Sequence, residues 1–127
     1  MPDLVSIHHV KIPVSDVRAS SEWYQRVLGL EVAIEFIEDG ELRGVALDAP
    51  DGGTPIALRH EPERAAALAG FDLVALGVPT RDGVHAWVDH LAALGQKHGG
   101  LLTGHRGGTV LVGLQDPDGI EIRLYAD

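Results

Sequence analysis

Every second residue is hydrophobic in a short stretch near the start of the chain. This period of two predicts a strand with two unlike faces. The hydrophobic spacing then becomes that of a helix, which we expect to follow an N-cap at Ser15 or Asp16 and to end at Gly29. The strand pattern consists of Val10, Ile12 and Val14 alternating with His9, Lys11 and Pro13, and the helix stripe consists of Val17, Trp23, Val27 and Leu30. The first predicted unit is therefore a strand that leads directly into a helix.

Three further strands are predicted in the first half of the chain. Residues 31–37 and 42–48 alternate, and the Asp39-Gly40 dipeptide between them is typical of a hairpin turn. A Pro-Asp-Gly-Gly turn at residues 50–53 precedes another alternating strand at residues 54–60. The alanine-rich segment 61–70 is typical of a short helical connector.

The same order of elements begins again at residue 73. Residues 73–78 have a strand pattern, Thr80 is a candidate N-cap, and a hydrophobic helical stripe ends at Gly95. Strands are predicted at residues 109–114 and 120–125, separated by the turn Asp-Pro-Asp-Gly of residues 116–119. The helical stripe consists of Val84, Trp87, Val88, Leu91 and Leu94.

The two halves align by a nearly constant offset. Adding 64 takes Val10, Ile12, Val14 and Trp23 to Val74, Leu76, Val78 and Trp87, and adding 66 takes Ile56 and Leu58 to Ile122 and Leu124. We therefore predict an α+β fold with two βαβββ modules, residues 1–60 and 71–127, joined by the connector at 61–70. The modules should form a single domain, a curled mixed sheet around a cleft with helices on its outer face.

Composition narrows the class of protein. A chain of 127 residues with 45% hydrophobic and 23% charged residues fits one compact globular domain. Cysteine is absent, which excludes disulfides, thiolate catalysis and sulfur-ligated metals. The net charge of −9 disfavours nucleic acid as a partner. Neither a secretion signal nor an apolar run of about 20 residues is visible, so we expect a cytoplasmic protein without a membrane partner.

Two motifs resemble those of a known family. Residues 9–30 contain Val-Ser-Asp and Trp-Tyr-x-x-Val-Leu-Gly-Leu, and residues 116–122 are Asp-Pro-Asp-Gly-Ile-Glu-Ile. In these motifs the chain resembles the vicinal oxygen chelate superfamily, which includes glyoxalase I, extradiol dioxygenases, and fosfomycin- and bleomycin-resistance proteins. The resemblance covers essentially the whole chain and implies the two-module fold, a small-molecule ligand and a homodimer.

The resemblance also implies where metal ligands would stand. In the metal-dependent members they come from the first and last strands of each module, which correspond here to His9, Ala57, Leu73 and Arg123. Only His9 could bind a metal, because aliphatic side chains have no lone pair and a guanidinium repels a cation. A divalent ion needs about three protein ligands, so we expect no metal cofactor.

Strand alternation groups the remaining polar candidates. It places Lys11 with His9, Arg59 with Ala57, and Arg123 with Glu121 and Tyr125. If these faces line the cleft, it is cationic, with Glu121 as an opposing charge, and suits an acidic ligand bound by Arg59 and Arg123. Neighbouring cations favour a neutral imidazole at His9, which makes it a candidate general base.

Less specific interpretations stay open for the same residues. Arg123 could form a structural pair with Glu121 or Glu35, and Arg59 and Lys11 could extend into solvent. His9 could have no role beyond packing.

Two functions therefore remain. The first is a metal-free binding protein like the bleomycin-resistance members, with an acidic ligand, although the acidic surface would itself favour cationic ones. The second is a metal-dependent lyase, isomerase or dioxygenase that uses His9, with the metal completed by Glu121 or His60. The sequence leaves open whether the chain is an enzyme.

Overall fold

The chain folds as two compact units, which we describe separately. A computed structural model describes all residues from 1 to 127, and the units are Met1–Ala65 and Ala66–Asp127. The boundary falls within the segment 61–70 that we predicted as a connector, where the structure has a short helix, α2 (Pro62–Ala67). The arrangement of the two units as one domain around a cleft stays a prediction.

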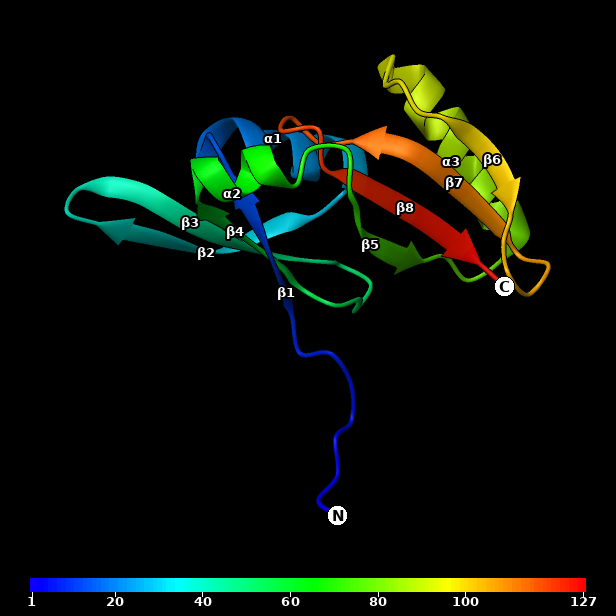
Figure 1. Cartoon of the computed structure of the whole chain (residues 1–127), viewed down its shortest axis with the longest axis horizontal. Helices are drawn as coiled ribbons and strands as arrows, with labels where there is room; N and C mark the ends of the chain where they lie inside the picture. The colour runs from blue at the N-terminus through cyan, green and yellow to red at the C-terminus, as the bar shows by residue number, and fades with distance from the viewer. The chain divides into compact units, whose positions relative to one another are not determined.

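The N-terminal unit is a four-stranded mixed sheet with one long helix (Figure 1). Its strands are β1 (Val10–Val14), β2 (Glu31–Glu38), β3 (Glu41–Asp48) and β4 (Ile56–His60), in the spatial order β1-β4-β3-β2. Helix α1 (Val17–Leu28) begins after Asp16, whose carboxylate accepts from the Ala19 N–H at 3.0 Å. The β2–β3 turn has positive φ at Asp39 and Gly40, as a type I′ hairpin requires.

The C-terminal unit repeats this architecture. Its strands are β5 (Asp72–Gly77), β6 (Gly100–Thr103), β7 (Thr109–Gln115) and β8 (Glu121–Ala126), in the order β5-β8-β7-β6. Helix α3 (Arg81–Leu94) begins after Thr80, whose hydroxyl accepts from the Gly83 N–H at 3.0 Å, and ends at Gly95. The predicted pair of βαβββ modules is therefore confirmed.

Strand register confirms the offset between the modules. Val10 pairs with Ile56 in the first module, and their equivalents Val74 and Ile122 pair in the second. Ile12 with Leu58 and Leu76 with Leu124 repeat the relation one step further along the strands. Both pairs of strands are parallel, so the repeat extends to the hydrogen-bonding pattern.

Each unit has its own core between its helix and one face of its sheet. In the first, Ile12, Val45 and Leu58 are buried against α1, and in the second, Leu111, Ile122 and Leu124 are buried on the side of α3. Trp23 is buried as predicted. Its equivalent Trp87 is only half-buried and meets the His90 ring edge-on, at a centroid distance of 5.2 Å. No helix is long and apolar enough to cross a membrane.

Candidate functional site

The predicted site residues lie on the sheet faces that point away from the helices. We call the face of each sheet opposite its own helix the helix-free face. Register defines two rows across this face in the N-terminal sheet. One row is Lys11, Ala57, Ala46 and Ile34, and the other is Pro13, Arg59, Gly44 and Phe36. Lys11 and Arg59 therefore share one face, in neighbouring rows, as strand alternation predicted.

The helix-free face of the C-terminal sheet carries the other predicted group. Arg123 is paired in register with Ala75, and Tyr125 with Gly77 and Val110, which itself pairs with Leu102. Glu121 lies two residues before Arg123 on β8, so its side chain points to the same face. Arg123, Glu121 and Tyr125 are thus brought together within one strand.

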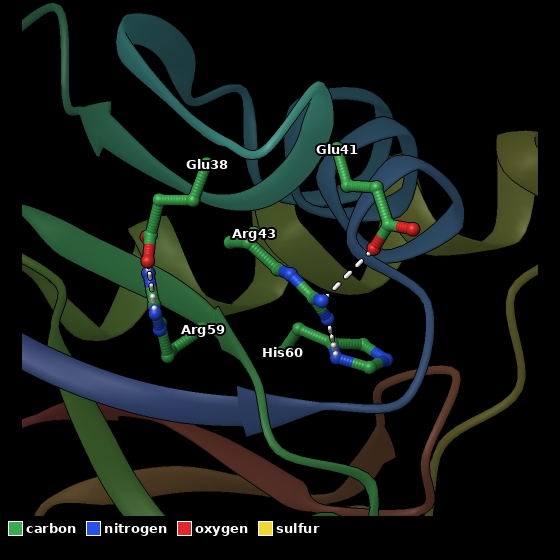
Figure 2. Close-up of polar contacts among 5 residues, drawn as sticks. All are labelled: Glu38, Glu41, Arg43, Arg59 and His60. Atoms are coloured by element: carbon green, nitrogen blue, oxygen red, sulfur yellow. Dashed lines mark hydrogen bonds and ion pairs between the residues drawn. The ribbon is translucent and has the colours of Figure 1, made fainter.

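Arg59 lies across its own sheet toward the edge strand. A Cβ placed on Gly44 would lie 3.6 Å from Cδ of Arg59 and 3.7 Å from a ring carbon of Phe36. The arginine stem therefore passes Gly44 at ordinary van der Waals distance from where a side chain would begin. On β2, Oε1 of Glu38 accepts from Nη2 of Arg59 at 3.1 Å, and Nη1 donates to Oε2 in a second, shorter bond (Figure 2).

This two-pronged pair shifts the acid–base properties of both groups. The hydrogen bonds from Arg59 lower the pKa of the Glu38 carboxyl below its ordinary value, and the positive charges of Arg59 and Arg43 add to the effect. The same hydrogen bonds raise the pKa of Arg59. Both side chains are substantially exposed, so solvent screens the interaction.

Arg123 is held by two separate carboxylates. Its Nε donates to Oε2 of Glu121 at 2.5 Å, and its Nη1 lies 3.3 Å from Oδ2 of Asp72. The hydrogen bond to Glu121, with the nearby charges of Glu121 and Asp72, raises the pKa of Arg123. Nη2 makes no hydrogen bond within the protein, and 37% of the side chain is exposed. The guanidinium is therefore fixed at two of its nitrogens and free at the third.

These pairs change the charge that the sequence predicted for the site. Glu121 was the one carboxylate foreseen, and the structure adds Glu38 beside Arg59 and Asp72 beside Arg123. Lys11 forms no ion pair. The helix-free face of the N-terminal sheet therefore keeps one unpaired cation, Lys11. On the C-terminal sheet, the single positive charge of Arg123 stands beside two negatively charged carboxylates.

Tyr125 is packed against the loop between β6 and β7. A side chain on Gly104 or Gly108 would collide with the Tyr125 ring, and these two glycines are joined by an N–H···O bond of 2.8 Å. Tyr125 occupies the position equivalent to Arg59, so both side chains at this place in the repeat lie against glycine backbone.

His9 lies just outside the first strand. We predicted it within the strand, but β1 begins at Val10, whose N–H donates to the Pro55 carbonyl at 3.2 Å. Pro55 has no N–H to extend the ladder to His9. The His9 ring is exposed, with its Nδ1 at 2.9 Å from Nδ1 of His8, so Nε2 is the nitrogen left for another partner. Its role as a general base stays a prediction.

His60 forms a separate polar cluster with Arg43 and Glu41. Arg43 donates through Nη1 to Nδ1 of His60 at 3.2 Å, and its Nη2 lies 2.9 Å from Glu41 (Figure 2). Because an arginine can only donate, Nδ1 of His60 is the acceptor and its proton sits on Nε2. His60 ends β4 while His9 precedes β1, so the two lie roughly 16 Å apart along these parallel strands. They could not share one metal ion.

The residues present do not fit the metal set of the resemblance. Neither unit contains a group of three or more histidine or acidic side chains that could hold an ion. At the other three positions, Ala57, Leu73 and Arg123 have no lone pair to offer a metal ion. Arg123 is also paired with Glu121 and Asp72.

A pocket of about 510 Å³ lies on the opposite side of the N-terminal sheet. It is bounded by Arg18, Glu22 and Gln25 of α1 and by Val32 and Leu42 of β2 and β3. None of the predicted site residues lines it.

The repeated module and the polar helix-free faces place the chain among two-module α+β proteins whose fold hosts many small-molecule chemistries. The family model for the Glyoxalase/Bleomycin resistance protein/Dioxygenase superfamily matches residues 6–124, and the chain belongs to this superfamily.

Individual relatives are distant. The chain is 26% identical over 128 residues to the protein described as "Putative ring-cleaving dioxygenase MhqA" of Bacillus subtilis, covering 95% of this chain but only 40% of that protein. Two solved structures share the fold. Lactoylglutathione lyase from Agrobacterium tumefaciens has a TM-score of 0.77 at 16% identity, covering 98% of this chain and 96% of that one. The fosfomycin resistance protein FosX from Listeria monocytogenes has a TM-score of 0.73 at 15% identity, with coverages of 98% and 95%.

Proposed function

We propose that the chain is a glyoxalase/bleomycin-resistance-like protein that binds a small acidic molecule without a metal ion. The observation that carries this proposal is the pairing of Arg123, the residue that the resemblance aligns with a metal-ligand position of the family. Its Nε and Nη1 are fixed by Glu121 and Asp72, and its Nη2 has no partner in the protein. A guanidinium fixed in this way can donate to a carboxylate with little loss of side-chain freedom.

The helix-free face of each sheet also carries exposed apolar side chains. On the N-terminal sheet, Ile34 and Phe36 lie in the same rows as Lys11 and Arg59 and are 52% and 43% exposed. On the C-terminal sheet, Leu102 lies in the row of Tyr125 and is 57% exposed. Apolar walls with a few charged groups are typical of small-molecule sites, so an aromatic or aliphatic acid is the class of ligand we propose.

His9 is the candidate general base in this account, with its Nε2 free to accept a proton. Lys11, which has no ion pair, is the unpaired cation on the helix-free face of the N-terminal sheet. We further propose that the protein is cytoplasmic and acts as a homodimer. The resemblance to the family implies the dimer, and light scattering after gel filtration tests it.

A metal-dependent lyase, isomerase or dioxygenase is the second candidate. It is favoured by the similarity to MhqA, which extends over nearly the whole of this chain. Such an enzyme would need ligands besides His9 and Glu121, and Glu121 is engaged by Arg123.

The two candidates differ in metal content and in the charge of the molecule that stabilises the fold. We would measure metal by mass spectrometry on protein purified without chelator, and unfolding temperature with benzoate, neutral benzamide or cationic benzylammonium. The proposal predicts less than stoichiometric metal and a rise in unfolding temperature with benzoate alone, because a ligand selective for the folded state stabilises it. Stoichiometric metal, or stabilisation only by benzylammonium, would contradict it.

A further inference from the structure

We infer that Glu38 determines which ligands the N-terminal sheet accepts, because it occupies the terminal nitrogens of Arg59 that an acidic ligand would need. This inference rests on the proposed function and assigns a specificity role within it. Glu38 is not one of the residues that strand alternation brought to the site, because it lies at the far end of the edge strand β2.

The Glu38 carboxylate is bound as a ligand carboxylate would be. Both of its oxygens accept from Arg59, one from Nη1 and one from Nη2, which is the parallel arrangement typical of arginine with a bound acid (Figure 2). Only Nε of Arg59 is left without a partner. An incoming carboxylate must therefore displace Glu38 before it can make a two-pronged contact.

The stem of Arg59 has a place of its own on the sheet. Its Cδ lies 3.6 Å from where a Cβ on Gly44 would stand, and the backbone of β4 is paired on both sides, with β1 and with β3. The inference assigns Glu38 the role of a competitor for the terminal nitrogens of Arg59, because it occupies both of them.

The C-terminal sheet shows the opposite arrangement. The carboxylates of Glu121 and Asp72 bind Arg123 at Nε and Nη1 and leave Nη2 free. An acid can therefore reach Arg123 directly, whereas Arg59 is closed to it. The N-terminal sheet should then accept neutral, apolar groups and disfavour a carboxylate.

The experiment is a benzoate titration followed by NMR on the full chain, comparing the wild type with Glu38→Gln. We expect the NMR signals of the N-terminal sheet to report benzoate binding about tenfold tighter in Glu38→Gln than in the wild type, since the variant loses one acceptor and the negative charge beside Arg59. Glu41→Gln is the matched control, because Glu41 faces Glu38 across the same hairpin but pairs with Arg43. It removes the same charge and should leave the affinity unchanged.

A double variant, Glu38→Gln with Arg59→Gln, tests whether the tighter benzoate binding occurs at Arg59. If Arg59 is the donor to benzoate, the gain in affinity should disappear in this variant. Equal affinities in Glu38→Gln and Glu41→Gln, a gain that survives Arg59→Gln, or weaker binding in Glu38→Gln would each overturn the inference. Because the gain is measured at Arg59, it can appear even if wild-type protein binds no benzoate. Failure of the proposed function and failure of this inference therefore give different results.

Discussion

The two modules each place an arginine on a helix-free face, but the two arginines are paired in different ways. Arg59 is equivalent to Tyr125 in the repeat, and Arg123 is equivalent to Ala57, so the cations stand on different rows of the two sheets. Arg59 gives both terminal nitrogens to one carboxylate, and Arg123 gives Nε and Nη1 to two. The ion pairs therefore leave Nη2 of Arg123 without a partner but neither terminal nitrogen of Arg59, and the proposed binding of an acid depends on this difference.

The largest expected effect comes from the glycine beside Arg59. A Cβ at Gly44 would lie 2.7 Å from the Leu58 carbonyl oxygen, which is too close for backbone to tolerate without a shift. We expect Gly44→Ala to lower the free energy of unfolding by about 1–3 kcal/mol, as overpacking does. Urea unfolding measures this effect.

Gly77 provides the control in the other module. It is the C-terminal row partner of Tyr125, and a Cβ there would meet no atom within 4 Å. Gly77→Ala should therefore change the free energy of unfolding by less than about 1 kcal/mol. If both variants cost the same, close packing against the Leu58 carbonyl does not make a side chain at residue 44 costly.

A smaller effect on stability is expected when the pH is lowered. Since the pKa of Glu38 is lowered in the folded protein, the unfolded chain takes up its proton first as the pH falls. The stabilisation from the Glu38–Arg59 pair is therefore complete above the ordinary pKa of 4.5 and is lost as the pH falls through the lowered value. The difference in unfolding temperature between wild type and Glu38→Gln should be small at pH 7 and smaller at pH 3.

Differential scanning fluorimetry at the two pH values measures this difference. The variant Glu41→Gln shows how far a general loss of negative charge on the hairpin accounts for it. A difference between wild type and Glu38→Gln that grows toward pH 3 would mean that the pair does not stabilise the folded protein.

Most of the fold follows from sequence pattern, because period-two and helical spacing are set by burial on one face. The equivalences Val10 to Val74 and Ile56 to Ile122 even predict which residues pair. Strand β6 was not assigned from its sequence, since it is short, begins with Gly100 and continues a glycine-rich segment. The start of β1 was misplaced by one residue, because it depends on the missing N–H of Pro55 on a different strand.

For the candidate site, the sequence predicted which side chains share a face of one strand, but not which side chains on different strands are in contact. Alternation correctly grouped Glu121, Arg123 and Tyr125, which lie on β8. Glu38 and Asp72 were missed because their contacts cross from one strand to another and depend on register. One signal was available for Glu38: the Asp39-Gly40 turn fixes the β2–β3 register and so places Glu38 at the end of the edge strand.

The most direct test compares the two arginines by benzoate affinity in otherwise unchanged protein. Arg123→Gln should abolish the binding measured for the wild type, because Arg123 is the arginine with a free terminal nitrogen among the two on the helix-free faces. Arg59→Gln should leave that binding unchanged, because Glu38 already occupies its donors. Loss of binding in Arg59→Gln with retention in Arg123→Gln would contradict the account.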